Sequence, residues 1–160
     1  MIPKPKAPGG AVYLPPLPED LDRYLAASEA RFAGVRRQTE KKIVWRSSPK
    51  RGTDLAIVYL HGFSASRMEL HPLCDLLAQK LEANLFYTRL NGHGQDGPAL
   101  AAAKVEDWIQ DGLEALAVGN RLGRRIILIG TSTGAALATW LAAHAPQRPA
   151  IHALILISPN

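Results

Sequence analysis

The chain has 160 residues, of which 47% are hydrophobic and 21% are charged, and its formal net charge is +5. This length and composition suit one folded domain and exclude a largely disordered chain beyond the first dozen or so residues. The positive charge does not indicate nucleic-acid binding, because the basic residues are scattered and no basic run is interleaved with aromatic residues. Residues 115–160 contain four arginines and no carboxylate, which accounts for most of the excess.

Residues 1–20 lack the apolar stretch of a secretory signal, and the longest mostly apolar stretch, 134–145, is too short to cross a bilayer. We therefore expect a cytoplasmic protein without a membrane span. The single cysteine, Cys74, excludes an internal disulfide, and its leucine-rich surroundings favour a small buried hydrophobic residue over a nucleophile. No metal-binding or phosphate-binding motif occurs, so we expect neither a metal nor a cofactor.

The N-terminal region predicts an extended arm followed by a helix. Residues 1–18 contain six prolines and two glycines, a composition that prevents regular structure. Glu19 and Asp20 are typical of a helix start, because acidic residues there interact well with the helix dipole. Apolar residues then recur at helical spacing as far as Phe32, with Gly34 near the end.

From residue 42 onward, strands and helices are expected to alternate. Lys42–Arg46 predicts an outer strand, and continuous apolar runs predict buried strands. Leucines 70, 73, 77 and 81 are expected on one side of the first of these helices. The expected order is strand 55–60, helix 68–82, strand 84–89, helix 105–121, strand 126–129, helix 133–144 and strand 153–157. This alternation indicates an α/β fold with a mainly parallel sheet and helices on both faces.

Three predicted strands end in glycine-containing turns with polar or reactive side chains: His61-Gly62-Phe63-Ser64, Asn91-Gly92-His93-Gly94 and Gly130-Thr131-Ser132-Thr133-Gly134. Function in open parallel sheets collects at the carboxyl ends of the strands. The third turn matches G-x-S-x-G between an apolar strand and a helix, the context in which this motif holds a nucleophilic serine. Ser132 is therefore the candidate nucleophile. Gly130 and Gly134 flank it, because side chains there would collide with the neighbouring strand and helix.

A serine nucleophile needs an oxyanion hole, which usually consists of two backbone N–H groups. We expect one from Thr133, which follows the serine, and the other from Phe63 in the turn after the earlier strand. Gly62 lets the backbone approach closely at that turn. The ring of His61 is expected to hydrogen-bond to backbone.

The chain resembles the α/β-hydrolase superfamily, and within it the esterases and monoacylglycerol-lipase-like enzymes. The resemblance rests on H-G-F at 61–63, N-G-H-G at 91–94 and G-T-S-T-G at 130–134, and it covers about residues 40–160. It implies the roles given above for Ser132, Phe63 and Thr133, and it implies that Gly92 and His93 shape the loop beside the site. We accordingly divide the chain into an N-terminal arm and helix, 1–40, and a partial α/β-hydrolase domain, 41–160.

The rest of a catalytic triad is missing from the sequence. The family order is Ser, then Asp or Glu, then His, yet no acidic residue follows Ser132. His144 falls at the far end of the helix that starts at the serine, and His152 begins the next strand, so neither is expected to reach it. His93 and Asp96 lie three apart on one loop, a spacing that rarely aligns two side chains in series. The resemblance implies that a lid and the strands carrying the acid and histidine would follow residue 160.

Two hypotheses therefore remain. In the first, the chain is part of a serine hydrolase that cleaves a small-molecule carboxylic ester through an acyl-enzyme on Ser132, completed by a missing C-terminal half or a second chain. Thioesterases, lactonases and peptidases share this turn, and ester hydrolysis leads only through the resemblance. In the second, the chain is a truncated, non-catalytic module. A sheet that ends at its last predicted strand exposes an apolar edge and one face, so we also expect homo-oligomers or pairing with the missing half.

Overall fold

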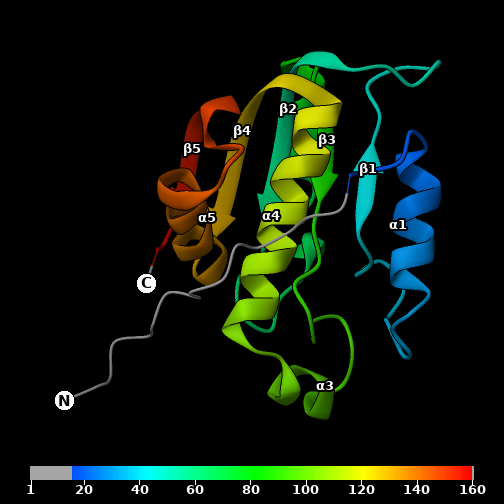
Figure 1. The fold of residues 1–160 in the computed structure, drawn as a ribbon, viewed down its shortest axis with the longest axis vertical. Coiled ribbons are helices and arrows are strands. Elements are labelled where there is room, and N and C mark those ends of the chain that lie inside the picture. The colour runs from blue at the N-terminus through cyan, green and yellow to red at the C-terminus, as the bar shows by residue number, and fades with distance from the viewer. Residues whose placement is uncertain (1–15, 160) are drawn as a thin grey trace.

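The computed structural model describes residues 16–159, so most of the predicted arm at residues 1–18 lies outside the described part of the chain. Five strands form one sheet in the order β1-β3-β2-β4-β5 (Figure 1). Only β1 runs antiparallel to its neighbour in this sheet. The strands are β1 Lys42–Val44, β2 Thr53–Leu60, β3 Asn84–Tyr87, β4 Gly123–Thr131 and β5 Ile151–Ile157. The mainly parallel sheet and its outer strand at residue 42 are thus confirmed.

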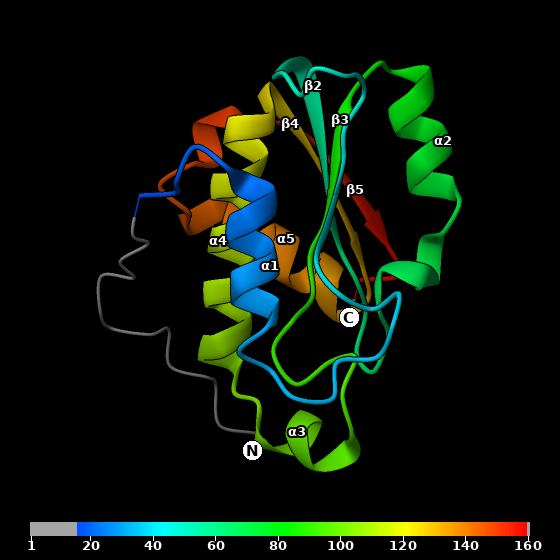
Figure 2. The same ribbon diagram turned by 90° about the vertical axis from the view of Figure 1, so that its right-hand side faces the viewer.

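Helices cover both faces of the sheet, as the sequence predicts. Figure 2 shows α1, α4 and α5 on one face and α2 alone on the other. The helices are α1 Leu21–Glu29, α2 Leu73–Lys80, α3 Gly97–Ala102, α4 Val105–Leu122 and α5 Thr133–His144, with short 3-10 helices at Arg67–Leu70 and Arg148–Ala150. No helix within residues 16–159 combines the length and the apolar character needed to cross a bilayer.

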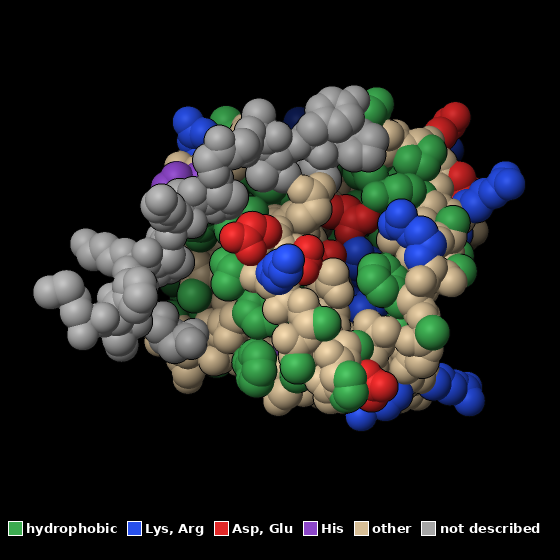
Figure 3. Space-filling view, turned by 60° about the horizontal axis from the view of Figure 1, so that its bottom comes forward, with side chains coloured by type: hydrophobic (Ala, Val, Ile, Leu, Met, Phe, Trp, Pro, Cys, Tyr) green, Lys and Arg blue, Asp and Glu red, His purple; other side chains and the backbone are tan. Residues whose placement is uncertain are grey.

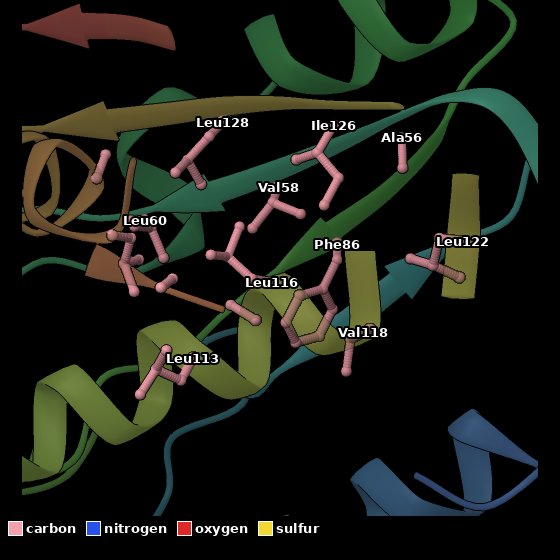
Figure 4. Packing of buried hydrophobic residues seen from close by; sticks show 14 of the residues in the cluster. Ala56, Val58, Leu60, Phe86, Leu113, Leu116, Val118, Leu122, Ile126 and Leu128 are labelled. Atoms are coloured by element: carbon pink, nitrogen blue, oxygen red, sulfur yellow. The ribbon is translucent and has the colours of Figure 1, made fainter. Parts of the chain in front are cut away.

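The larger hydrophobic core lies between α4 and the sheet, where apolar side chains of β2, β3 and β4 meet those of the helix (Figure 4). Leu21 and Leu25 of α1 also belong to this core. Our division of the chain at residue 40 stays a prediction, but the helix before that boundary packs on the same core as the sheet. α4 ends at Leu122 and β4 begins at Gly123, so no loop separates them.

The predicted helix over residues 68–82 is wrong in its extent, and its leucines differ in burial: Leu70 and Leu77 pack against the core, whereas Leu73 and Leu81 are exposed. The segment forms a 3-10 helix at Arg67–Leu70, and α2 begins only after Pro72, because proline has no N–H to donate within a helix. The side of α2 that faces the sheet carries the small residues Cys74 and Ala78, while Leu73 is 55% exposed. Small side chains allow the helix to lie close to the sheet. The burial of Cys74 is confirmed.

The short helix α3 was not predicted, because six residues are too few for an apolar period to be visible. Its start signal is nevertheless present in the sequence. Asp96 caps the helix by accepting the Ala99 N–H at 3.0 Å, and Pro98 occupies the first turn.

Candidate active site

The turns after β2 and β4 lie side by side at the carboxyl edge of the sheet. The two strands are parallel neighbours, and their paired residues extend to Leu60 and Gly130, immediately before the turns. The chain leaves β2 for β3 on one side and returns to β4 on the other, which creates the topological switch point where open α/β sheets bind ligands. Figure 3 views the molecule from this end and shows acidic and basic side chains intermixed, with hydrophobic side chains between them.

Ser132 forms the turn between β4 and α5. Its backbone has φ 50° and ψ −116°, a combination that is rarely populated and costs about 1–3 kcal/mol. The surrounding structure holds it there: the Ser132 N–H donates to the Ile157 carbonyl at 2.9 Å, and the Ser132 carbonyl accepts the Ala135 N–H at 2.9 Å. The sharp bend that the sequence predicts is therefore present, with a half-buried serine at its apex.

Gly130 and Gly134 lie where no side chain fits. A Cβ at Gly134 would stand 2.1 Å from the Leu60 carbonyl oxygen, and a Cβ at Gly130 would stand 2.4 Å from the Gly134 carbonyl oxygen. Both distances are far inside contact range, and the atoms met are backbone atoms. The two glycines let the first turn of α5 pack directly against the end of β2, which brings the Ser132 turn next to His61.

His61 is fully buried and joins two of the turns through its ring. Its Nε2 accepts the Leu90 N–H at 3.1 Å, so the proton resides on Nδ1, which donates to the Gly62 carbonyl at 2.9 Å. Burial lowers the pKa of His61 to about 4, which keeps the ring neutral. The predicted hydrogen bonding of this ring to backbone is thus found, and it ties the turn after β2 to the chain after β3.

The two predicted oxyanion donors are placed at the adjacent turns. Phe63 is 57% exposed, and Thr133 is the first residue of α5. Neither N–H donates to another group within the described residues, whereas the Gly62 N–H is engaged by Glu69 at 2.9 Å. Among the three amides of Gly62, Phe63 and Thr133, two are thus free to bind an oxygen atom of a ligand.

The third turn borders the site through His93. Gly92 has a φ of 77°, which favours glycine, and the His93 ring is buried. The ring centroid of His93 lies 5.9 Å from that of Phe63 and 5.5 Å from that of Trp108. Its Nδ1 hydrogen-bonds to the Asn91 carbonyl at 3.1 Å, and burial lowers the pKa of the ring. In this arrangement His93 supports the Phe63 ring.

Two residues that hold this third turn were missed in the sequence. The Trp108 indole donates to the Asn91 carbonyl at 3.0 Å, and the Asp111 carboxylate accepts the Asn91 N–H at 2.6 Å. Burial raises the pKa of Asp111 to about 6, and the nearby Lys41 opposes this rise. Both residues lie on α4, the helix that follows the turn; Trp108 belongs to its apolar face, and nothing local in the sequence shows that either residue contacts Asn91.

The other histidines and the acid of the 93–96 loop are not brought to the serine. The His144 ring stacks on Trp140 with centroids 4.9 Å apart, and Asp96 caps α3. The Ser132 hydroxyl makes no hydrogen bond with any residue in 16–159, and no metal-binding cluster occurs over the same range.

An apolar pocket of about 240 Å³ opens between the N-terminal parts of α4 and α5. Thr133 lines it, so the pocket adjoins one of the free amides. Its other lining residues are apolar: Val105, Trp108, Ile109, Ala136, Leu137 and Trp140. A pocket of about 430 Å³ around Thr53 and Arg121 lies at the opposite end of the sheet, away from the three turns.

Comparison with known proteins finds a family match and similar solved structures. A family model described as serine aminopeptidase, S33, matches residues 52–160. A similar structure, from the work on the metagenome-derived lipolytic enzymes LipS and LipT, has a TM-score of 0.67 at 24% identity and covers 78% of this chain and 47% of that one. Est1E from Butyrivibrio proteoclasticus, with ferulic acid bound, has a TM-score of 0.58 at 23% identity, with 75% and 48% covered.

The esterase PF2001 of Pyrococcus furiosus has a TM-score of 0.51 at 20% identity, with 76% of this chain and 50% of that one covered. At such identities the likeness shows the fold alone. The chain spans about half the length of these solved structures. A search of curated proteins finds none that matches.

Proposed function

The chain belongs to the serine aminopeptidase S33 family of α/β hydrolases, and from this we propose that it carries the nucleophile half of a serine hydrolase acting on carboxylic esters. The observation that carries the proposal is the backbone of Ser132, held at φ 50° and ψ −116° between β4 and α5. This turn costs free energy, and strained backbone of this kind is concentrated at active sites. The esterase and lipolytic structures of the same fold support an ester as the substrate.

The proposed reaction uses the three turns together. The Ser132 oxygen attacks the ester carbonyl carbon and passes its proton to a histidine base that lies outside the described residues. The Phe63 and Thr133 N–H groups stabilise the oxyanion of the tetrahedral intermediate. The intermediate expels the alcohol, which takes up the proton, and leaves an acyl group on Ser132. Water then hydrolyses this acyl-enzyme and regenerates the serine.

We propose that further polypeptide, from a missing C-terminal half or a second chain, completes the site. β5 is the edge strand of the sheet, and its Leu154, Ile155 and Leu156 are 38–39% exposed. α2 alone covers one face of the sheet and leaves β5 bare on that side (Figure 2). The exposed strand supports both a pairing of the sheet with the missing half and an association of two copies of this chain. A charged substitution, Ile155→Glu, should disrupt specific pairing at this strand, and association that persists in the variant would instead be non-specific aggregation.

A fluorophosphonate probe, which labels activated serines, tests the assignment. We expect the complete gene product to be labelled at Ser132, as mapped by peptide mass spectrometry, and Ser132→Ala to abolish the labelling. Ser64→Ala is the matched control, because Ser64 lies in the neighbouring exposed turn. Absence of labelling in the complete product would instead support a non-catalytic module.

The family description gives peptide hydrolysis as a second candidate function. Hydrolysis of p-nitrophenyl butyrate and of aminoacyl p-nitroanilides by the complete product distinguishes the two substrate classes. We expect the ester to react with the higher kcat/KM, because the pocket beside Thr133 is apolar and offers no carboxylate for a free amino group. Preference for the anilides would overturn the ester assignment but keep Ser132 as nucleophile.

A further inference from the structure

The exposed residue Glu69 hydrogen-bonds directly to the turn after β2 and reaches the end of β4 through Tyr59. It belongs to the 3-10 helix before α2, and its Oε2 accepts the Gly62 N–H at 2.9 Å and the Tyr59 hydroxyl at 2.6 Å. The Tyr59 oxygen lies 3.2 Å from Thr131 Oγ1. Gly62 directly precedes Phe63, and Thr131 directly precedes Ser132. One carboxylate therefore connects the two segments that would supply the oxyanion donors and the nucleophile.

Glu69 is exposed, but its carboxylate lies close to the Gly62 backbone. A Cβ at Gly62 would stand 2.9 Å from Glu69 Oε1 and 3.4 Å from the Thr131 carbonyl oxygen. Tyr59 is fully buried, so its hydroxyl has no access to water as a substitute partner. Burial and the neighbouring Glu69 carboxylate raise the pKa of Tyr59, which keeps its hydroxyl a proton donor. The buried Tyr59 hydroxyl thus depends on Glu69 and Thr131 as its partners.

The same hydrogen bond decides which amide of the His61–Phe63 turn is free. Because Glu69 takes the Gly62 N–H, the Phe63 N–H is the one left for a ligand. An oxyanion hole works when its donors are fixed before the charge develops, and a displacement of about 1 Å is enough to lose much of the rate. A single side chain that fixes both turns would therefore act on the transition state rather than on substrate binding.

We propose that Glu69 is a positioning residue of the active site, which holds the Phe63 amide and the Ser132 turn in register through Gly62 and through the Tyr59–Thr131 pair. This inference rests on the proposed function for its catalytic consequence. Glu69 acts by accepting hydrogen bonds and not by its charge, because a negative charge near a developing oxyanion would oppose catalysis. A glutamine can keep the same contacts, since its carbonyl oxygen in the place of Oε2 accepts both the Gly62 N–H and the Tyr59 O–H.

The test compares kcat and KM of the complete gene product with those of Glu69→Ala, Glu69→Gln and Tyr59→Phe. We expect Glu69→Ala to lower kcat about tenfold or more while KM changes less than about threefold, because the lost contacts act in the transition state. Glu69→Gln should retain kcat within about threefold. Tyr59→Phe should lie between these two, since it breaks only the connection to Thr131. Glu82→Ala is the matched control, as this exposed glutamate pairs with Arg46 on the surface.

Binding of an alkyl boronic acid, which forms a tetrahedral adduct with an active serine, supplies a second measurement. Its affinity should fall in Glu69→Ala in parallel with kcat, whereas a general loss of stability would lower the melting temperature and leave the kcat of the folded fraction unchanged. The inference is overturned if Glu69→Ala and Tyr59→Phe both keep wild-type kcat, or if Glu69→Gln loses as much as Glu69→Ala.

Amide hydrogen exchange at Gly62 makes the test independent of activity. We expect exchange at Gly62 to accelerate in Glu69→Ala and to stay slow in Glu69→Gln, and unchanged exchange in Glu69→Ala would refute the connection itself. A wild-type protein that neither hydrolyses esters nor reacts with the fluorophosphonate would refute the proposed function. In that case, the exchange result still shows whether Glu69 holds the turn.

Discussion

The close contact of α5 with the end of β2 predicts the effect of adding one methyl group at Gly134. In Gly134→Ala the new Cβ would stand 2.1 Å from the Leu60 carbonyl oxygen and 2.6 Å from that of His61. Ordinary contact begins at 3.4 Å, so the helix and strand must separate by 3.4 − 2.1 = 1.3 Å along that line. Both partners are backbone atoms, so no side-chain rotation can relieve the contact.

We expect this overpacking to cost about 1–3 kcal/mol of unfolding free energy. For a chain of this size, that corresponds to a fall in Tm of roughly 2–12 °C. A shift of about 1 Å between Ser132 and Phe63 should also reduce fluorophosphonate labelling of the complete product by up to about 100-fold. Thermal unfolding followed by circular dichroism and the rate of labelling are the two measurements.

Gly97→Ala is the matched control, because nothing lies within 4 Å of a Cβ at Gly97 and the residue starts the exposed helix α3. This substitution should leave Tm unchanged or raise it slightly. If Gly134→Ala melts and labels like the wild type, the close packing of the Ser132 turn against β2 is not what positions the serine.

Three further predictions concern ionisable groups. The pKa of His61 is lowered to about 4, so the contribution of His61 to the unfolding free energy is present above pH 6.5 and lost as the pH falls towards 4. The pKa of Asp111 is raised to about 6, so its effect on the unfolding free energy has the opposite sign, and the fold gains stability as the pH falls below 6. Each full effect is about 3 kcal/mol. Urea unfolding between pH 7 and 4.5 should therefore show more acid sensitivity in Asp111→Asn than in the wild type, and equal slopes would contradict this. Arg89→Ala leaves Glu29 without its buried partner and should lower the unfolding free energy by about 3–5 kcal/mol. Adding Glu29→Gln should restore part of this loss, and a loss below about 1 kcal/mol in Arg89→Ala would refute the prediction. Cys74 is buried and its pKa is raised to about 12, so a thiol reagent at pH 8 should modify it only after unfolding; rapid modification of the native chain would show that the helix opens.

The strands and the Ser132 turn could be predicted because their signals are local. β2 and β4 are continuous apolar runs, which indicate strands buried on both faces. The G-x-S-x-G pattern requires two glycines around one serine, and the close contacts at Gly130 and Gly134 explain that requirement. In each case the residues that determine the structure are neighbours in the sequence.

The parts that escaped prediction depend on contacts between distant segments. The fully buried positions of α2 are the small residues Cys74 and Ala78, and the leucine spacing alone does not show which leucines face the sheet. The contacts of Glu69 and Asp111 with the turns arise only when the 3-10 helix and α4 are placed on the sheet. The sequence around a carboxylate on the polar face of a helix does not show which backbone amide it will hydrogen-bond to.

The direct joint between α4 and β4 has a consequence for how the site can adapt to ligands of different size. α4 has 18 residues and is therefore about 27 Å long. It continues into β4 at Gly123 without an intervening loop. Trp108 at one end of this helix and Ser132 at the end of β4 therefore belong to one stiff frame. A bulky ligand cannot push that wall outward without bending the sheet. Any widening of the entrance therefore falls to residues 93–104, which lead from the third turn into α4 and form turns and one short helix.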